Sequence, residues 1–214
     1  MIFNLSAQNT IANQFISELR DKDIQLDRAR FRRNMKRLGQ LMAYEISKKL
    51  NFKDTTIKTP LGQSSLQVIS QHPVLLTVLR AGIPYFDGFL DFFDHSDCGF
   101  IGAYRQEGSA EIVIHLDYVA TPDIEGREII LIDPMLATGK SFIHAVQSLL
   151  KRGTPSHIYI AALVSAPEGI HYIKENLHVP HSIYTCALDE NLNHQFYIVP
   201  GLGDAGDLSF GIKL

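Results

Sequence analysis

The chain has few of the features that mark disulfide-rich, membrane or secreted proteins. Its 214 residues include only two cysteines, Cys98 and Cys186, and no window approaches 18 consecutive apolar residues. The cysteine spacing matches no zinc or redox motif, so we interpret both as small buried side chains in strands. We expect no membrane-spanning helix. We also expect no secretory signal, because no basic segment precedes an apolar one at the N-terminus. These features predict a cytoplasmic protein.

A strong charge of either sign is also missing. The chain has 20 Lys and Arg residues against 23 Asp and Glu residues, a formal net charge of −3. This balance predicts no overall attraction to nucleic acid or to an anionic membrane. One local basic cluster remains, formed by Arg28, Arg30, Arg32, Arg33, Lys36 and Arg37. It is either a nucleic-acid surface or a solvated or subunit-facing helix surface. We favour the second interpretation because no aromatic platform or nucleic-acid motif accompanies it.

The length suits one domain, and we divide the chain into three parts. Residues 1–72 are expected to be helical, because apolar side chains recur at spacings of three and four after Asp27, a plausible N-cap. Residues 73–195 are expected to form the core. Within it, 106–126 is a long excursion of the kind that often acts as a lid over a site. Residues 196–214 form a glycine-rich C-terminal segment, which suits a backbone that closely approaches a ligand.

Short β-rich runs alternate with helical stretches through the core. The expected strands are 74–79, 99–104, 128–133, 158–164 and 182–187, and the expected helices are 85–93, 141–152 and 167–177. This alternation predicts an α/β fold, with an open, mostly parallel sheet and helices on both faces. The uninterrupted apolar run at 129–132 is typical of a strand that is buried on both faces.

The most informative segment joins that apolar strand to the next helix. The backbone N–H groups at the start of a helix form a ready anion site. Gly139 would let the backbone approach a phosphate, and Thr138 and Ser141 offer hydroxyl groups. A simple helix N-cap is the alternative interpretation. We favour phosphate binding because the strand leads directly into the loop and Asp133 stands at its carboxyl end.

Gly139-Lys140-Ser141 also matches the end of a Walker A loop, which would predict a nucleotide triphosphatase. That motif requires glycine at position 134, where this chain has Pro134. Proline has no N–H to donate and its φ angle is restricted, so this interpretation is disfavoured. A ribose phosphate fits better. The Asp133 carboxylate can accept hydrogen bonds from two vicinal ribose hydroxyls while the loop holds the 5-phosphate.

The segment Asp-Pro-Met-Leu-Ala-Thr-Gly at 133–139 resembles the phosphoribosyl-pyrophosphate (PRPP) loop of the type I phosphoribosyltransferases. Its exact sequence resembles that of the uracil phosphoribosyltransferase family in particular. Four further segments resemble that family in the same order: residues 79–82, 102–105, 166–169 and 197–207. Order and spacing agree from about residue 15 to the C-terminus, so the resemblance is specific. It implies a lid at 106–126 and a hood formed by the terminal segments.

The resemblance also implies roles for individual residues. Arg80 and Arg105 would contact the diphosphate, Asp133 would hold the ribose hydroxyls, and Asp204 would contact the phosphoribosyl substrate or its metal shell. These four would be the catalytic residues, with a surface ion pair as the alternative for the arginines and a turn-forming role for Asp204. PRPP would also contact Pro134, Met135, Leu136, Ala137, Thr138, Gly139, Lys140 and Ser141. Uracil would contact Ile198, Gly203, Asp204 and Ala205.

The implied reaction transfers the 5-phosphoribosyl group of PRPP to N1 of uracil and gives UMP and pyrophosphate, a step of pyrimidine salvage. Magnesium would arrive with PRPP and have no direct protein ligand. The expected partners are these two small molecules and further copies of the chain, in a dimer or a tetramer, with no membrane and no nucleic acid. Activation by GTP is left open.

The sequence departs from the family pattern at two places, and two alternative functions remain. The chain has Lys140 where the uracil enzymes usually have glycine, and residues 107–121 match the family loosely. A same-fold regulator would bind uridine nucleotides and RNA with little or no turnover, using the basic cluster at 28–37. A transferase for another base is the second rival. The complete segment at 197–207 disfavours both.

Overall fold

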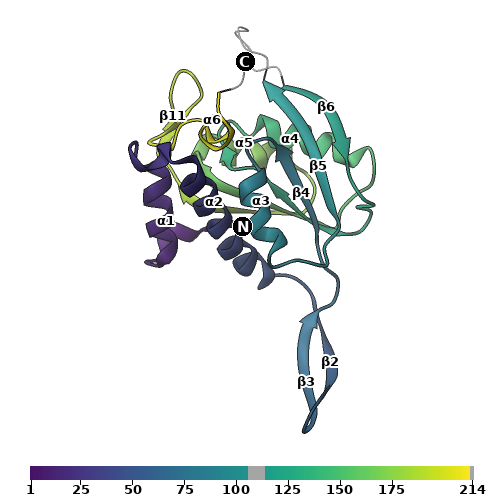
Figure 1. Ribbon diagram of the computed structural model, residues 1–214. Coiled ribbons are helices and arrows are strands. Elements are labelled where there is room, and N and C mark those ends of the chain that lie inside the picture. Colours follow the sequence, from purple (N-terminus) through teal and green to yellow (C-terminus); the bar gives the residue numbers. More distant parts are fainter. Residues whose placement is uncertain (106–113, 213–214) are drawn as a thin grey trace.

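A computed structural model describes residues 1–105 and 114–212, and a mostly parallel sheet forms the centre of the molecule (Figure 1). Every strand pairing in this sheet is parallel except that of β5 with β6. The predicted sheet type is therefore confirmed. The strand order is β1 (Ile2–Asn4), β10 (His181–Leu188), β9 (His157–Ser165), β7 (Glu128–Ile132), β4 (Val74–Leu79), β5 (Cys98–Arg105) and β6 (Ile114–Ala120), with β8 (Met135–Leu136) beside β9.

Helices cover both faces of this sheet (Figure 1). One face carries α1 (Ile11–Arg20), α2 (Arg28–Ser47) and α3 (Ile83–Leu90), and the other carries α4 (Lys140–Leu150) and α5 (Pro167–Asn176). In β7, Ile130 and Ile132 pack with the first layer, whereas Ile129 and Leu131 pack with the second. The strand is apolar throughout because each face of the sheet meets its own layer of helices.

The predicted core strands all form, with each end within one residue of its predicted place. The N-cap of α2 is also confirmed, since Asp27 Oδ1 accepts the N–H groups of Ala29 and Arg30 at 3.0 Å each. The remaining elements are short. They are the 3-10 turns η1 (Leu5–Ala7) and η2 (Ile24–Leu26), the strands β11 (Asn191–Leu192) and β12 (Ile198–Val199), and the helix α6 (Ala205–Phe210).

The expectation that residues 1–72 are helical is wrong for β1, an edge strand of the central sheet, and for residues 52–69. The latter form an antiparallel hairpin of β2 (Phe52–Thr59) and β3 (Gly62–Ile69), which extends away from the rest of the molecule (Figure 1). The β-branched residues in β2 favour an extended chain. Most of the hairpin is exposed, so it carries no clear core-facing pattern for a sequence reading to detect.

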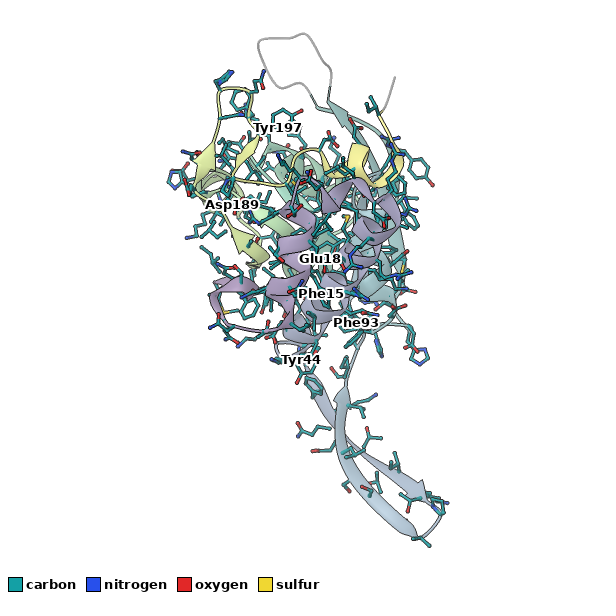
Figure 2. All side chains as sticks on the ribbon, turned by 60° about the vertical axis from the view of Figure 1, so that its left-hand side comes forward. Phe15, Glu18, Tyr44, Phe93, Asp189 and Tyr197 are labelled. Carbon is teal, nitrogen blue, oxygen red and sulfur yellow. The ribbon has the colours of Figure 1, made fainter. Side chains whose placement is uncertain are left out.

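The basic side chains of α2 are largely used within the chain. This favours the interpretation of a packed and solvated helix surface over a nucleic-acid surface. Glu18, labelled on the helical layer in Figure 2, accepts hydrogen bonds from Arg30 and Asn34, which lower its pKa to about 2. The contacts of the cluster are Arg30 Nη2 with Glu18 Oε1 at 2.8 Å, Arg32 Nη1 with the Ser209 carbonyl at 2.7 Å, Arg37 Nη1 with Asn34 Oδ1 at 3.0 Å and Lys36 Nζ with Asp91 Oδ2 at 3.0 Å.

The expected lid at 106–126 lies partly outside the described residues, because 106–113 are not among them. Its described remainder contains β6, which runs antiparallel to β5. Both cysteines are free and lie in strands as predicted, Cys186 buried and Cys98 half-buried. Among residues 1–105 and 114–212, no helix has the length and apolar character needed to cross a bilayer.

Candidate active site

The candidate site lies where the strand order reverses. From β4 the chain passes through α3 to β5 on one side, and it later returns as β7 on the other side of β4. In open α/β sheets, ligands bind outside the carboxyl ends of the strands at such a switch point. β4 and β7 pair in register up to Thr77 and Ile132. Arg80 and Asp133 therefore follow the ends of neighbouring strands.

The first half of the loop after β7 is fixed against β9 by backbone hydrogen bonds. The Pro134 carbonyl accepts the N–H groups of Leu163 and Val164 at 3.0 Å, and the Leu136 carbonyl accepts the N–H of Ala166 at 2.9 Å. The missing N–H of Pro134 is therefore no disadvantage, since its carbonyl makes the contact. The loop leaves the strand along a defined path.

The second half of the loop packs backbone to backbone against the start of α5. Gly139 has a φ of +77°, and a Cβ there would lie 2.7 Å from the Gly169 carbonyl oxygen. A Cβ on Gly169 would lie 2.2 Å from the carbonyl oxygen of Ala137. Only glycine fits at either position. Gly169 belongs to a motif that the sequence reading singled out, yet that reading assigned it no role.

This arrangement leaves a set of free backbone donors at the start of α4. Among the described residues, no acceptor faces the N–H groups of Ala137, Thr138, Gly139 and Ser141. The N–H of Lys140 makes only a long contact of 3.4 Å to Thr138 Oγ1. Converging N–H groups at the positive end of a helix suit a phosphate. The residues predicted to wrap a phosphate are thus brought together.

Asp133 is a half-buried carboxylate with little to stabilise its charge. Its one hydrogen bond within the described chain comes from the N–H of Met135, at 3.1 Å from Oδ1. Burial raises its pKa to about 7, because the single donated bond offsets only part of the lost solvation. Such a carboxylate gains most from a ligand that donates hydrogen bonds, as vicinal hydroxyls do.

Arg80 follows β4 after a cis Leu79–Arg80 peptide and faces the C-terminal segment. Its Nη2 donates to the Gly211 carbonyl at 3.1 Å and lies 3.4 Å from Asp207 Oδ1. The alternative interpretation, an exposed ion pair, is therefore realised in this structure. The backbone of Arg105 ends β5, and its side chain lies outside what the structure describes.

The segment predicted to bind the base reaches the same edge of the sheet. A Cβ on Gly206 would lie 3.7 Å from the Cβ of Ala81, in the loop after β4. Asp204 caps α6, with its Oδ1 accepting the N–H of Asp207 at 2.9 Å. Its turn-forming role is therefore present, and it uses one of the two carboxylate oxygens. Ile198 and Ala205 are buried, whereas Gly203 is exposed at a φ of +91°.

Two residues of this region were missed by the sequence reading. Asp189 follows β10, and its carboxylate is held by Arg20, the last residue of α1. Both side chains also bind the backbone of Gly201. Asp189 comes two residues after the predicted strand 182–187, and Asp133 ends the predicted strand 128–133, so a place near a strand end was the one signal for Asp189. Arg20 offered none, because its partners are far away in the sequence.

Comparison with known proteins agrees with this geometry. A family model described as uracil phosphoribosyltransferase matches residues 6–212. The uracil phosphoribosyltransferase of Porphyromonas gingivalis is 44% identical over 214 residues, which is 100% of this chain and 99% of the relative. That of Lactococcus lactis subsp. cremoris is 46% identical over 186 residues, 86% of this chain and 87% of the relative. The solved structure of the AQ2163 protein from Aquifex aeolicus superposes with a TM-score of 0.88 at 28% identity, covering 100% of both chains.

We predict that Asp133→Asn makes the ligand-free protein more stable at alkaline pH. A carboxyl with a folded pKa of about 7 binds its proton more tightly in the fold than in the unfolded chain. Its contribution therefore destabilises the fold progressively as pH rises from about 4 to about 7. The asparagine variant has no carboxyl group at this position, so its free energy of unfolding does not fall in this way as pH rises. Its free energy of unfolding in urea should exceed that of the wild type by about 2 kcal/mol at pH 8 and by far less at pH 4.

The matched control is Asp94→Asn, since the Asp94 side chain is largely exposed. It should show no such pH-dependent difference. An Asp133→Asn variant that is less stable than the wild type at pH 8 would contradict the assignment of Asp133 as a destabilising, partly buried carboxylate.

Proposed function

The chain belongs to the uracil phosphoribosyltransferase family, and from that membership we propose that the carboxyl edge of β4 and β7 carries out the family's reaction. The enzyme is a pentosyltransferase that transfers the 5-phosphoribosyl group of PRPP to N1 of uracil, giving UMP and pyrophosphate. The observation that supports this site most is the combination of the under-solvated Asp133 with the free N–H groups of residues 137–141.

One strand, loop and helix would hold both ends of the ribose phosphate. The vicinal ribose hydroxyls would donate to Asp133, which lacks other donors apart from the Met135 N–H. The free N–H groups of Ala137, Thr138, Gly139 and Ser141 would bind the 5-phosphate, with the hydroxyls of Thr138 and Ser141 as further donors. Lys140 at the start of α4 adds a positive charge. Both contacts come from one rigid unit, which fixes the anomeric carbon relative to the sheet.

Arg80 and Arg105 would bind the diphosphate, because a guanidinium matches phosphate oxygens and stays charged. In this structure Arg80 contacts the Gly211 carbonyl and Asp207. The Arg80 side chain is 45% exposed, so this ion pair is weak. A diphosphate carries more charge than one carboxylate and would replace it. Charge that develops on the leaving group would then be stabilised by the arginines.

The base would lie against Ile198, Gly203, Asp204 and Ala205. Backbone N–H and carbonyl groups in this segment would read the O2, N3–H and O4 groups of uracil. Cytosine presents a different donor and acceptor at positions 3 and 4. It would therefore leave polar groups of the segment unpaired, which permits discrimination by orders of magnitude.

The reaction breaks the bond between the anomeric carbon and the diphosphate oxygen, forms the bond from that carbon to uracil N1, and releases the N1 proton to solvent or to the departing diphosphate. It passes through an oxocarbenium-like state, and the protein need not supply a covalent nucleophile. The chain's residues hold the two substrates in line and stabilise charge on the leaving diphosphate. The segment 106–126 would exclude water from the reacting carbon, so that PRPP is not hydrolysed.

Magnesium is proposed to arrive with the diphosphate, where it would offset phosphate charge. The donor set fits this arrangement. Among the described residues, no three His, Cys, Asp or Glu side chains converge on one point. Magnesium is commonly held by substrate phosphates, water and one or two carboxylates. Asp204, which uses Oδ1 for its helix cap, retains Oδ2 for a contact to the substrate or to metal-bound water.

A place in pyrimidine salvage and a cytoplasmic location follow as parts of the same proposal. Two free cysteines, one of them buried, suit a reducing compartment. The rival function as an RNA-binding regulator has no support in the structure, since four of the basic side chains in α2 contact groups of the chain itself.

We also propose a homo-oligomer that uses the β2–β3 hairpin. In the described chain this hairpin is a two-stranded sheet of its own, and such a hairpin is marginally stable without a packing partner. Its pairings of Thr55 with Leu66 and Ile57 with Ser64 place Ile57 and Leu66 on one face. Both are exposed, at 41% and 51%. A second copy of the chain would cover this face.

The direct test of function is an assay with uracil, PRPP and magnesium. We expect UMP and pyrophosphate in equal amounts, and no nucleotide from cytosine, hypoxanthine or orotate. A parallel reaction with GTP measures activation. If folded protein gives no UMP, the proposed function is wrong, and if one of the other bases reacts better than uracil, the base assignment is wrong.

Lys140 is expected to strengthen PRPP binding. Lys140→Met removes the charge but keeps an unbranched side chain, and we expect the KM for PRPP to rise about threefold to tenfold, the effect of one charge near a phosphate. The control is Lys151→Met at the other end of α4, which should leave this KM unchanged. An unchanged KM for PRPP in Lys140→Met would show that the lysine only faces solvent.

The oligomer is tested by light scattering after gel filtration. The wild type should have the mass of a dimer or tetramer, and Leu66→Glu should shift it toward the monomer at micromolar concentration, because burying that charge is unfavourable. Ser65→Glu places the same charge on the opposite face of the hairpin and should keep the wild-type mass. A monomeric wild type, or equal effects of the two variants, argues against the hairpin as the interface.

A further inference from the structure

We propose that Arg20 and Asp189 form a positioning pair that holds the base-binding loop in register, so that base recognition depends on α1. This inference rests on the proposed function, because it assumes that the segment 198–205 reads the base. Neither residue belongs to the parts of the site assigned above to PRPP, uracil or magnesium.

The pair holds both polar backbone groups of a single residue. Asp189 Oδ2 accepts the N–H of Gly201 at 2.8 Å, and Arg20 Nη1 donates to the Gly201 carbonyl at 3.1 Å. Arg20 also donates to both carboxylate oxygens of Asp189 through its two terminal nitrogens. Figure 2 shows Asp189 on the side of the molecule where the β11–β12 segment with Tyr197 lies. The three groups form a closed set of hydrogen bonds.

Gly201 is the residue through which such a pair would act on the base. It lies between Ile198 and Gly203, whose backbone groups are proposed to face uracil. Its φ is +63°, and a Cβ would lie 2.1 Å from the Ile198 carbonyl oxygen, so the turn is tight. A movement of Gly201 would therefore be passed on to Ile198 and Gly203.

A second contact from the same region supports this role. The Gln25 side-chain amide, in the orientation that satisfies it, donates to the Leu202 carbonyl at 2.9 Å and to the Leu19 carbonyl at 3.0 Å. Gln25 lies in η2, directly after α1. Two consecutive residues of the base loop, 201 and 202, are thus contacted from the helical layer, and Gly201 is held in addition by Asp189 at the end of β10.

The burial of the Arg20–Asp189 pair indicates that the pair fixes the geometry of the base loop more than it stabilises the fold. The side chains of Asp189 and Arg20 are 4% and 22% exposed. A buried ion pair adds little stability over apolar residues of similar size, because both charges lose their solvation. Apolar residues have no hydrogen-bond donors, whereas the planar guanidinium of arginine has several donors in fixed directions. It can therefore bind a carboxylate and a carbonyl together.

The effect of the Arg20–Asp189 pair on uracil binding can be measured separately from PRPP binding. The ribose phosphate would be held by β7 and α4, which the Arg20–Asp189 pair does not contact, and Asp204, the one loop residue also assigned to PRPP, is fixed separately by its cap on α6. Weakening the pair should therefore affect uracil far more than PRPP. Displacing a recognition group by about 1 Å can reduce rates by about a hundredfold.

The experiment measures kcat and both KM values for Arg20→Lys and Asp189→Asn. Asp189→Asn should raise the KM for uracil roughly tenfold to a hundredfold, with a change below about threefold in the KM for PRPP. Arg20→Lys retains the charge but cannot span both partners, so its KM for uracil should lie between those of the wild type and Asp189→Asn. The kcat/KM for uracil should fall in the same order.

Glu18→Gln is the matched control. Glu18 lies on the same helix and makes a comparable ion pair with Arg30 at 2.8 Å, but this pair has no contact with the base loop. The control should lower the melting temperature and leave both KM values unchanged. Because Arg20→Lys is the milder change, it serves as the test if Asp189→Asn does not fold.

The outcomes separate the inference from the proposed function. A wild type that makes no UMP contradicts the function itself. An active wild type whose folded Arg20→Lys and Asp189→Asn variants keep the wild-type KM for uracil contradicts the positioning role and leaves the pair only structural. An equal rise in both substrates' KM values, or a rise in Glu18→Gln as well, also overturns the inference.

Discussion

The close approach of two backbones, at Gly139 and Gly169, is the constraint on which the site depends. Neither residue has room for a Cβ, so the loop after β7 is pressed against the start of α5. Held there and bound to β9 through Pro134 and Leu136, the loop has no freedom to satisfy its own N–H groups. The free donors and the desolvated Asp133 are therefore fixed by the fold at a cost in stability, and the proposed anion site rests on them.

The parts of the fold that could be predicted from sequence are those whose cause is local. The strand at 129–132 is apolar throughout because helices cover both faces, and α2 begins where Asp27 can cap it. The strand–loop–helix path from β7 to α4 was predictable for the same reason. The strand, Asp133, Gly139 and the helix follow one another within a short stretch of chain. A single segment therefore contains the residues proposed to bind the ribose phosphate.

The parts that could not be predicted depend on distant partners or on solvent. The hairpin at 52–69 packs little of its surface, so no core-facing periodicity distinguishes it from the helix before it. The contact of Arg20 with Asp189 joins residues 169 positions apart, and no local sequence pattern predicts such a pair. The basic cluster of α2 was ambiguous because its acceptors, among them Glu18 and the Ser209 carbonyl, lie on other elements.

The central claim is that one unit binds both ends of a ribose phosphate, with Asp133 on the hydroxyls and the loop on the phosphate. Calorimetric binding of UMP, uridine and 2′-deoxy-UMP to the wild type and to Asp133→Asn tests it directly. The wild type should prefer UMP over 2′-deoxy-UMP by about tenfold or more, the effect of one hydrogen bond to a charged group. It should bind uridine far more weakly than either. In Asp133→Asn the preference for the 2′-hydroxyl should largely disappear, whereas the preference for the phosphate should remain. Equal binding of UMP and 2′-deoxy-UMP to the wild type, or a preference that survives in the variant, would contradict the account.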